Sequence, residues 1–348
     1  MAIISRKKVP YRIQEPLHRF LEQYNRISPI SIHYEDLLRY ENVLPLYDKH
    51  GEDTLWYTVV YNHADMEAIH ENLKMIYATL KADGDISLME HLYIDRVDLC
   101  SYGNTQPFRV RVVNRVNDNF DYFYIKVADA SRVYGLELED ILSPNRVNFL
   151  VHEQTLIEEH IAGIPGDMFI SDYLEDGHQN KIRLAKEFIK FNERCFVQLL
   201  GDMHSSNFVV NIIPDFDEIN YRIRAIDFDQ QCYEGRKNIY LPQFYKQNMP
   251  IIELGMGRIS PESTRQYQAE ERFMMATRLI GSRHRARDIL RAMRSDKIAP
   301  RNNVVSLRED LQKHFDHEKF LKCESMGEIL TENMELLLKK QNKYKAMI

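Results

Sequence analysis

The spacing of hydrophobic residues predicts that the chain begins with helices and a strand. Residues 54–61 read TLWYTVVY and are aromatic and β-branched, which is typical of a strand. Residues 64–81 place hydrophobic side chains on one helical face, and Asp83-Gly84 marks the expected end of that helix. Apolar residues at helical spacing predict a shorter helix within residues 16–27. The first ninety residues therefore indicate a mixed α/β segment.

Three extended stretches come next and predict an antiparallel meander. They cover residues 92–99, 108–116 and 120–127, and each is rich in β-branched and aromatic residues. Turn-forming residues separate them at 101–104 and 117–119. The pattern indicates a small sheet of consecutive antiparallel strands.

The pattern beyond this sheet becomes mostly helical. We expect a helix over residues 145–162, a short strand at 168–170, and an extra helix within residues 134–144. From about residue 176 onward helical spacing dominates, and residues 181–199 form the clearest helix.

Two short strands are predicted inside the helical half, at residues 208–213 and 221–226, around a Pro214-Asp215 turn. Helical spacing returns from about residue 263 to the end. Strands first and helices later, with a small hairpin between them, indicate an α+β fold in two lobes.

Composition narrows the class of protein. The chain has 348 residues, of which 44% are hydrophobic and 28% charged, so we expect a globular protein of about two domains. The net charge of −6 argues against a general nucleic-acid binder. No apolar run approaches the length of a membrane span, and no signal peptide is expected. The four cysteines are scattered, which fits reduced thiols and a cytoplasmic location.

The most informative stretch for chemistry covers residues 199–229. Asp202 and Asn207 lie five residues apart between a predicted helix and a strand, and Asp227 ends the next strand. Mg²⁺ prefers carboxylate, amide and phosphate oxygens as ligands. Phosphoryl transfer also needs a carboxylate that orients the attacking hydroxyl and accepts its proton. These residues are therefore candidates for a magnesium-nucleotide site.

The sequences GDMHSSN and IDFD, at this spacing, resemble the protein-kinase superfamily. They are most similar to its aminoglycoside-phosphotransferase and choline-kinase-like branch, where the catalytic loop reads H-G-D-x-H-x-x-N and the metal-binding segment I-D-F/W-E/D. This chain keeps Gly201, Asp202, His204 and Asn207, and it has Leu200 where the branch usually has histidine.

The resemblance implies a role for each of these residues. Asp202 is the expected catalytic base, and His204 is expected to support the catalytic loop. Asn207 and Asp227 are expected to hold Mg²⁺ on the phosphates of ATP. Asp229, the second acid of this segment, is expected to be structural, with a ligand role as the alternative.

The superfamily also places a lysine on the third strand of its sheet, and Lys126 in the run YFYIKV matches that position. The resemblance implies that Lys126 contacts the α- and β-phosphates. A helix glutamate should orient this lysine. We choose Glu153, with Glu158 and Glu159 as alternatives on the same expected helix.

Two further segments are implied to contact ATP. The first hairpin of the meander takes the place of the glycine-rich loop, although it has a single glycine. The segment after residue 167 resembles the hinge, where adenine bonds to backbone groups. The residues assigned to ATP besides Lys126 are Ser101, Gly103, Asn104, Ser171, Asp172 and Tyr173.

The resemblance thus implies an α+β, two-lobed, protein-kinase-like fold with Mg-ATP bound between the lobes. We expect an N-terminal α/β extension over residues 1–91, a small antiparallel β-sheet lobe over 92–174, and a larger helical lobe over 175–348. The expected activity is ATP-dependent phosphotransfer to a hydroxyl acceptor. A small-molecule acceptor is favoured because no A-P-E segment follows Asp227. The alternatives are a catalytically weak nucleotide-binding or scaffold protein and a nucleotidyl transferase.

Overall fold

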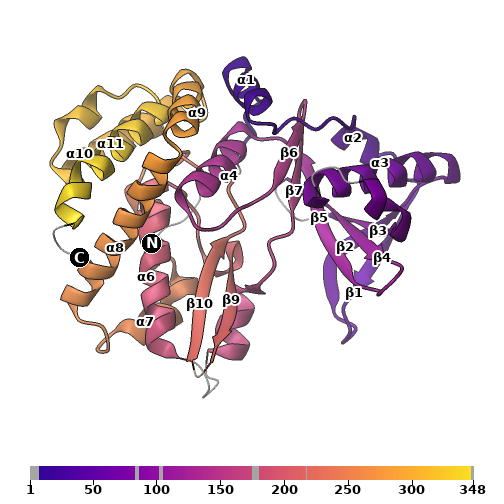
Figure 1. The fold of residues 1–348 in the computed structure, drawn as a ribbon, viewed down its shortest axis with the longest axis horizontal. Helices are drawn as coiled ribbons and strands as arrows, with labels where there is room; N and C mark the ends of the chain where they lie inside the picture. The colour runs from indigo at the N-terminus through magenta and orange to yellow at the C-terminus, as the bar shows by residue number, and fades with distance from the viewer. Residues whose placement is uncertain (1–7, 83–85, 102–104, 175–179, 217, 346–348) are drawn as a thin grey trace. The chain divides into compact units, whose positions relative to one another are not determined.

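The computed structural model describes residues 8–82, 86–101, 105–174, 180–216 and 218–345 (Figure 1). Its residues group into two compact units. The sheet unit consists of Leu21–Asp129 and Val147–His160, and the helical unit consists of Met1–Phe20, Ala130–Arg146 and Ile161–Ile348.

The sheet unit is built on a seven-stranded antiparallel sheet with the order β1-β2-β3-β4-β5-β7-β6. The strands are β1 (Asn42–Tyr47), β2 (Asp53–Val60), β3 (Leu92–Cys100), β4 (Phe108–Asn114), β5 (Phe120–Val127), β6 (Phe149–His152) and β7 (Thr155–Glu159). The predicted strand at 54–61 and the predicted three-stranded meander are therefore confirmed. Because Trp56 of β2 pairs with Cys100 of β3, residues before position 91 share one sheet with the meander.

Helix α3 (His63–Ala82), also predicted, packs against β3 and β4 in this unit (Figure 1). Leu73 and Ile76 on its inner face are fully buried in a core that includes Phe108 and Phe123 of the sheet. A short helix, α2 (Tyr34–Leu37), adds Leu37 to the same core. Burial of one apolar helical face against one sheet face is the main stabilising term expected for such a layer.

The expected helix over residues 145–162 is wrong, because this segment forms the β6–β7 hairpin. Phe149 and Val151 of β6 and Leu156 and Ile157 of β7 are all buried, so the hairpin is apolar on both faces. A short apolar run of this kind cannot be told from a buried helix by its spacing. Glu153, in the turn, has a left-handed φ of 50° that no helix interior would contain.

The helical unit contains most of the helices and a three-stranded sheet with the order β10-β9-β8. Its helices include α4 (Ala130–Leu142), α6 (Lys181–Gln198), α7 (Met249–Gly255), α8 (Pro261–Gly281), α9 (Arg283–Ser295), α10 (Arg301–Phe315) and α11 (Met326–Lys345). Its strands are β8 (Ile164–Pro165), β9 (Phe208–Asp215) and β10 (Glu218–Ala225). The predicted helix at 181–199, the two predicted strands and the helical C-terminal part are confirmed, as is the extra helix expected within residues 134–144. Near the N-terminus, α1 (Glu15–Gln23) matches the predicted short helix.

The expected strand at residues 168–170 is wrong. The chain there forms α5 (Gly166–Met168) and a π-helical turn over Phe169–Tyr173. Phe169 is fully buried and stacks on Tyr173 four residues later, with ring centroids 5.9 Å apart. That spacing places both rings on one face of a helical turn. No helix in the described part of the chain is long and apolar enough to cross a lipid bilayer.

Gly327, in the first turn of α11, lies against the backbone of α9. A Cβ at this position would meet the carbonyl carbon and oxygen of Met293 at 2.3 Å. We therefore expect Gly327→Ala to lower the free energy of unfolding by about 3 kcal/mol, because backbone atoms cannot move aside. Gly281→Ala at the end of α8 is the control, since a Cβ there meets nothing within 4 Å. Urea unfolding measures both variants, and an equal effect of the two would contradict this close packing.

Candidate active site

The loop that carries Asp202 is anchored on both sides by the fold of the helical unit. Helix α6 ends at Leu199, whose left-handed φ of 58° turns the chain away from the helix axis. Leu200 then forms a β-bridge with Gln231, which lies just beyond β10. The N–H of Gly201 donates to the carbonyl of Gln230 at 3.3 Å. Asp202 follows with a φ of 62°, a conformation that L-residues rarely adopt and that often marks functional sites.

Asp202 has a half-buried carboxyl group beside other acids. Its side chain is 23% exposed, and its backbone N–H donates to the carbonyl of Ile239 and the hydroxyl of Tyr245. Burial, and then the nearby charges of Asp227 and Glu234, raise the pKa of Asp202 to about 7. A carboxyl group with a pKa near neutrality can accept a proton efficiently near neutral pH.

Asn207 and His204 hold the shape of this loop. The Asn207 side-chain amide donates to the carbonyl of Asp202 at 2.8 Å, and the Asn207 backbone carbonyl accepts from the N–H of Ile226. His204 Nδ1 accepts from the N–H of Ser206, and its Nε2 lies 3.9 Å from the Asp202 carboxylate. Burial lowers the pKa of His204, so the ring is neutral at pH 7 and acts as a hydrogen-bonding support.

Asp227 and Asp229 share a buried arginine that the sequence analysis missed. Arg132 lies in the first turn of α4 with its side chain 3% exposed. Its Nη1 donates to Asp227 Oδ1 at 2.8 Å and to Asp229 Oδ1 at 2.9 Å. No motif in the sequence signals this contact, because the residues lie 95 and 97 positions apart and meet only through the packing of α4.

In the sheet unit, Lys126 on β5 pairs with Glu158 on the adjacent strand β7. Lys126 Nζ lies 2.8 Å from Glu158 Oε2, and the two side chains are only 11% and 6% exposed. Glu158 was one of the alternatives, and our choice of Glu153 is wrong. Glu153 lies in the hairpin turn with a 70% exposed side chain. Glu159, the third candidate, is 3.3 Å from Lys81 instead.

Of the three residues assigned to ATP in the first hairpin of the meander, the structure describes one. Ser101 is exposed just after β3, where its carbonyl accepts from Gln106 Nε2 at 3.4 Å. Gly103 and Asn104 lie outside the described residues. Ser101, Lys126 and Glu158 all belong to the sheet unit.

The expected hinge is not an extended strand. Ser171, Asp172 and Tyr173 belong to the π-helical turn, and the Ser171 hydroxyl donates to the carbonyl of Met168 at 3.1 Å. Helical hydrogen bonding occupies backbone groups that an extended hinge would offer to adenine. These three residues therefore do not form an extended hinge, and their contact with adenine stays a prediction.

No protein-family profile and no curated protein matches the sequence. Among solved structures, the chain is similar to the autoinhibited serine kinase domain of the giant muscle protein titin, with 14% identity and a TM-score of 0.30 over 69% of this chain and 92% of that chain. A second structure, titin kinase and its flanking domains, has 14% identity and a TM-score of 0.27 over 70% of this chain and 54% of that chain. These structure neighbours are protein-kinase domains. Because the TM-scores are low, the kinase-like interpretation rests on the residues of this chain.

Proposed function

We propose that this protein is an ATP-dependent phosphotransferase of the protein-kinase-like superfamily, with a hydroxyl group of a small molecule as the acceptor. The observation that supports this most is the Asp202 loop. A carboxyl group with a pKa of about 7 is held in a left-handed backbone conformation, next to Asn207 and the acid Asp227. A loop with a base and oxygen ligands at this spacing suits phosphoryl transfer.

Each residue has a defined part in this proposal. Asp202 accepts a hydrogen bond from the acceptor hydroxyl, orients it and takes its proton. Lys126, oriented by Glu158, contacts the phosphates of the nucleotide. The side chains of Asn207 and Asp227 offer the oxygen donors that suit Mg²⁺, and the ion supplies positive charge for the phosphates. Catalysis then comes from positioning and charge rather than from a covalent intermediate.

We expect ATP to stabilise the protein more strongly with Mg²⁺ than without it, because a ligand that binds only the folded state raises Tm. Asp227→Asn should remove most of this dependence on Mg²⁺ by removing a charged ligand. Asp215→Asn is the control, since Asp215 is an exposed acid at the end of β9 that lies away from Asn207. Thermal unfolding with ATP, with and without Mg²⁺, measures all three proteins. Equal loss in both variants would argue against a specific role of Asp227.

A second candidate function is nucleotide binding with weak transfer, and Arg132 is the observation that favours it. Its guanidinium already supplies a positive charge to Asp227 and Asp229, and its side chain is almost fully buried. If this charge takes the place of a metal ion, ATP should stabilise the wild type equally with and without Mg²⁺. Phosphate transfer to any hydroxyl acceptor should then be undetectable.

A further inference from the structure

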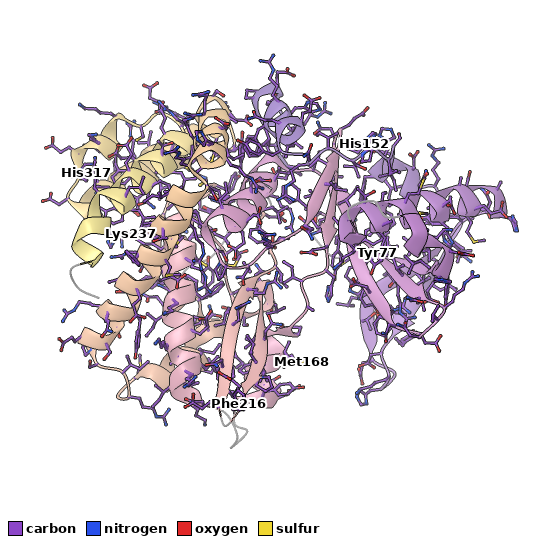
Figure 2. The ribbon with its side chains drawn as sticks, in the orientation of Figure 1. Tyr77, His152, Met168, Phe216, Lys237 and His317 are labelled. Atoms are coloured by element: carbon purple, nitrogen blue, oxygen red, sulfur yellow. The ribbon has the colours of Figure 1, made fainter. Side chains whose placement is uncertain are left out.

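Three side chains with metal-binding chemistry meet at the turn of the β6–β7 hairpin. His33, His152 and Glu153 each offer one ligand atom, and these three atoms all lie within 4.8 Å of one another. His33 Nδ1 is 3.8 Å from Glu153 Oε2, and the two imidazole rings have centroids 5.1 Å apart. Figure 2 labels His152, which forms the last pair of the hairpin with Thr155 before the turn.

The backbone brings these residues together from segments more than a hundred positions apart. The N–H of Ser28 donates to the carbonyl of Val151 at 2.8 Å, and the N–H of Val151 donates to the carbonyl of Arg26 at 2.8 Å. On the other side, the N–H of Tyr34 donates to the Thr155 hydroxyl at 2.9 Å. Residues 26–34 are thus attached to the hairpin on both sides of the three side chains. These hydrogen bonds add to the contacts that His33 makes with His152 and Glu153 within the cluster.

Two imidazoles and one carboxylate are a donor set for a first-row transition metal. Imidazole nitrogen suits Zn²⁺, whereas Mg²⁺ and Ca²⁺ prefer sites made of oxygen alone. Zinc bonds of about 2.0–2.1 Å place tetrahedral ligand atoms roughly 3.4 Å apart. His33 and Glu153 are 3.8 Å apart and all three ligand atoms lie within 4.8 Å of one another, so zinc binding needs side-chain rotations that bring these atoms closer together. The Ser31 hydroxyl lies 3.4 Å from His152 Nε2 and can orient that ring.

We propose that His33, His152 and Glu153 form a zinc site that fastens residues 26–34 to the β6–β7 hairpin. Three protein ligands leave one tetrahedral position for water. The His33 and Glu153 side chains are 39% and 70% exposed, so an ion can reach them from solvent. Because the three ligands are brought together only by folding, zinc binds the folded chain in preference to the unfolded chain and raises Tm. This proposal does not depend on phosphotransferase activity.

The test is titration of zinc chloride into the metal-free full-length protein, followed by calorimetry and by thermal unfolding. We expect one zinc ion per chain and a higher Tm at saturation. His33→Ala and His152→Ala should each weaken binding by at least about 100-fold, more than the loss of an outer-shell partner. The matched control His50→Ala removes an exposed histidine of the same unit and should bind like the wild type.

Glu153→Gln separates loss of the ligand from damage to the fold. Its side chain is exposed in a turn, so the metal-free variant should unfold at the same temperature as the wild type while binding zinc about tenfold or more weakly. Co²⁺ offers a second readout, because its visible absorption is stronger in a four-coordinate site than in the six-coordinate aqueous ion. The proposal is overturned if zinc binds the three ligand variants as tightly as His50→Ala, or if saturating zinc leaves the Tm of the wild type unchanged.

Discussion

Replacing Asp202 with asparagine should reduce phosphate transfer from ATP by about 10²–10⁴-fold, the usual contribution of a positioned general base. Asparagine keeps the size of the side chain but cannot accept the hydroxyl proton. In the wild type, kcat/KM should rise as pH increases through about 7, because this ratio reports the pKa of the base in the free enzyme. A radiolabelled-phosphate transfer assay across pH measures both effects.

The same substitution should stabilise the fold at alkaline pH. The pKa of Asp202 is about 7 in the folded chain, whereas an unperturbed aspartate, as in the unfolded chain, has a pKa of 3.8. The folded state therefore favours the protonated carboxyl group. Stability contributed by this group therefore falls as pH rises from about 4 to 7, and the loss is complete above pH 7. The Asp202→Asn variant avoids this loss because its amide does not ionise. For a side chain that is 23% exposed, we expect a gain of about 2 kcal/mol at pH 8 and none at pH 4.

Urea unfolding at both pH values tests this gain, with Asp215→Asn as an exposed control that should change stability at neither pH. A variant that is more stable at pH 8 and inactive would show that the site trades stability for function. Unchanged transfer in the Asp202 variant would mean that another group is the base.

The sequence predicted the position of the Asp202 loop because that position depends on neighbouring residues alone. The residues GDMHSSN follow one helix and precede one strand, and the structure keeps this order between α6 and β9. Arg132 could not be predicted in the same way. Its position beside Asp227 depends on how α4 packs within the helical unit, and nothing in the residues around position 132 indicates an acidic partner.

The β6–β7 hairpin shows a second limit of sequence reasoning. Phe149, Val151, Leu156 and Ile157 are buried in a strand pair, but the same residues fit a buried helix about as well. The error in secondary structure led to the wrong partner for Lys126, because a helix could place Glu153 toward this lysine whereas the hairpin places Glu153 in the turn. Strand pairing between β5 and β7 instead brings Glu158 to Lys126.

Glu158→Gln should therefore lower the free energy of unfolding by about 3 kcal/mol, whereas Glu153→Gln should change it by less than about 0.5 kcal/mol. The first substitution removes the carboxylate that lies 2.8 Å from a buried ammonium group, and the second changes an exposed turn residue. Urea unfolding of the metal-free proteins compares them directly. If the two variants were equally stable, the Lys126–Glu158 pair would not contribute to folding as its burial indicates.

A double variant separates the structural part of this ion pair from its part in nucleotide binding. Lys126→Met with Glu158→Leu removes both charges and fills the same volume with apolar atoms, so much of the stability lost in Glu158→Gln should return. Affinity for ATP should stay low, because the proposed phosphate contact is a charge that methionine cannot supply. Recovery of both stability and ATP affinity would mean that Lys126 serves the core of the sheet unit alone.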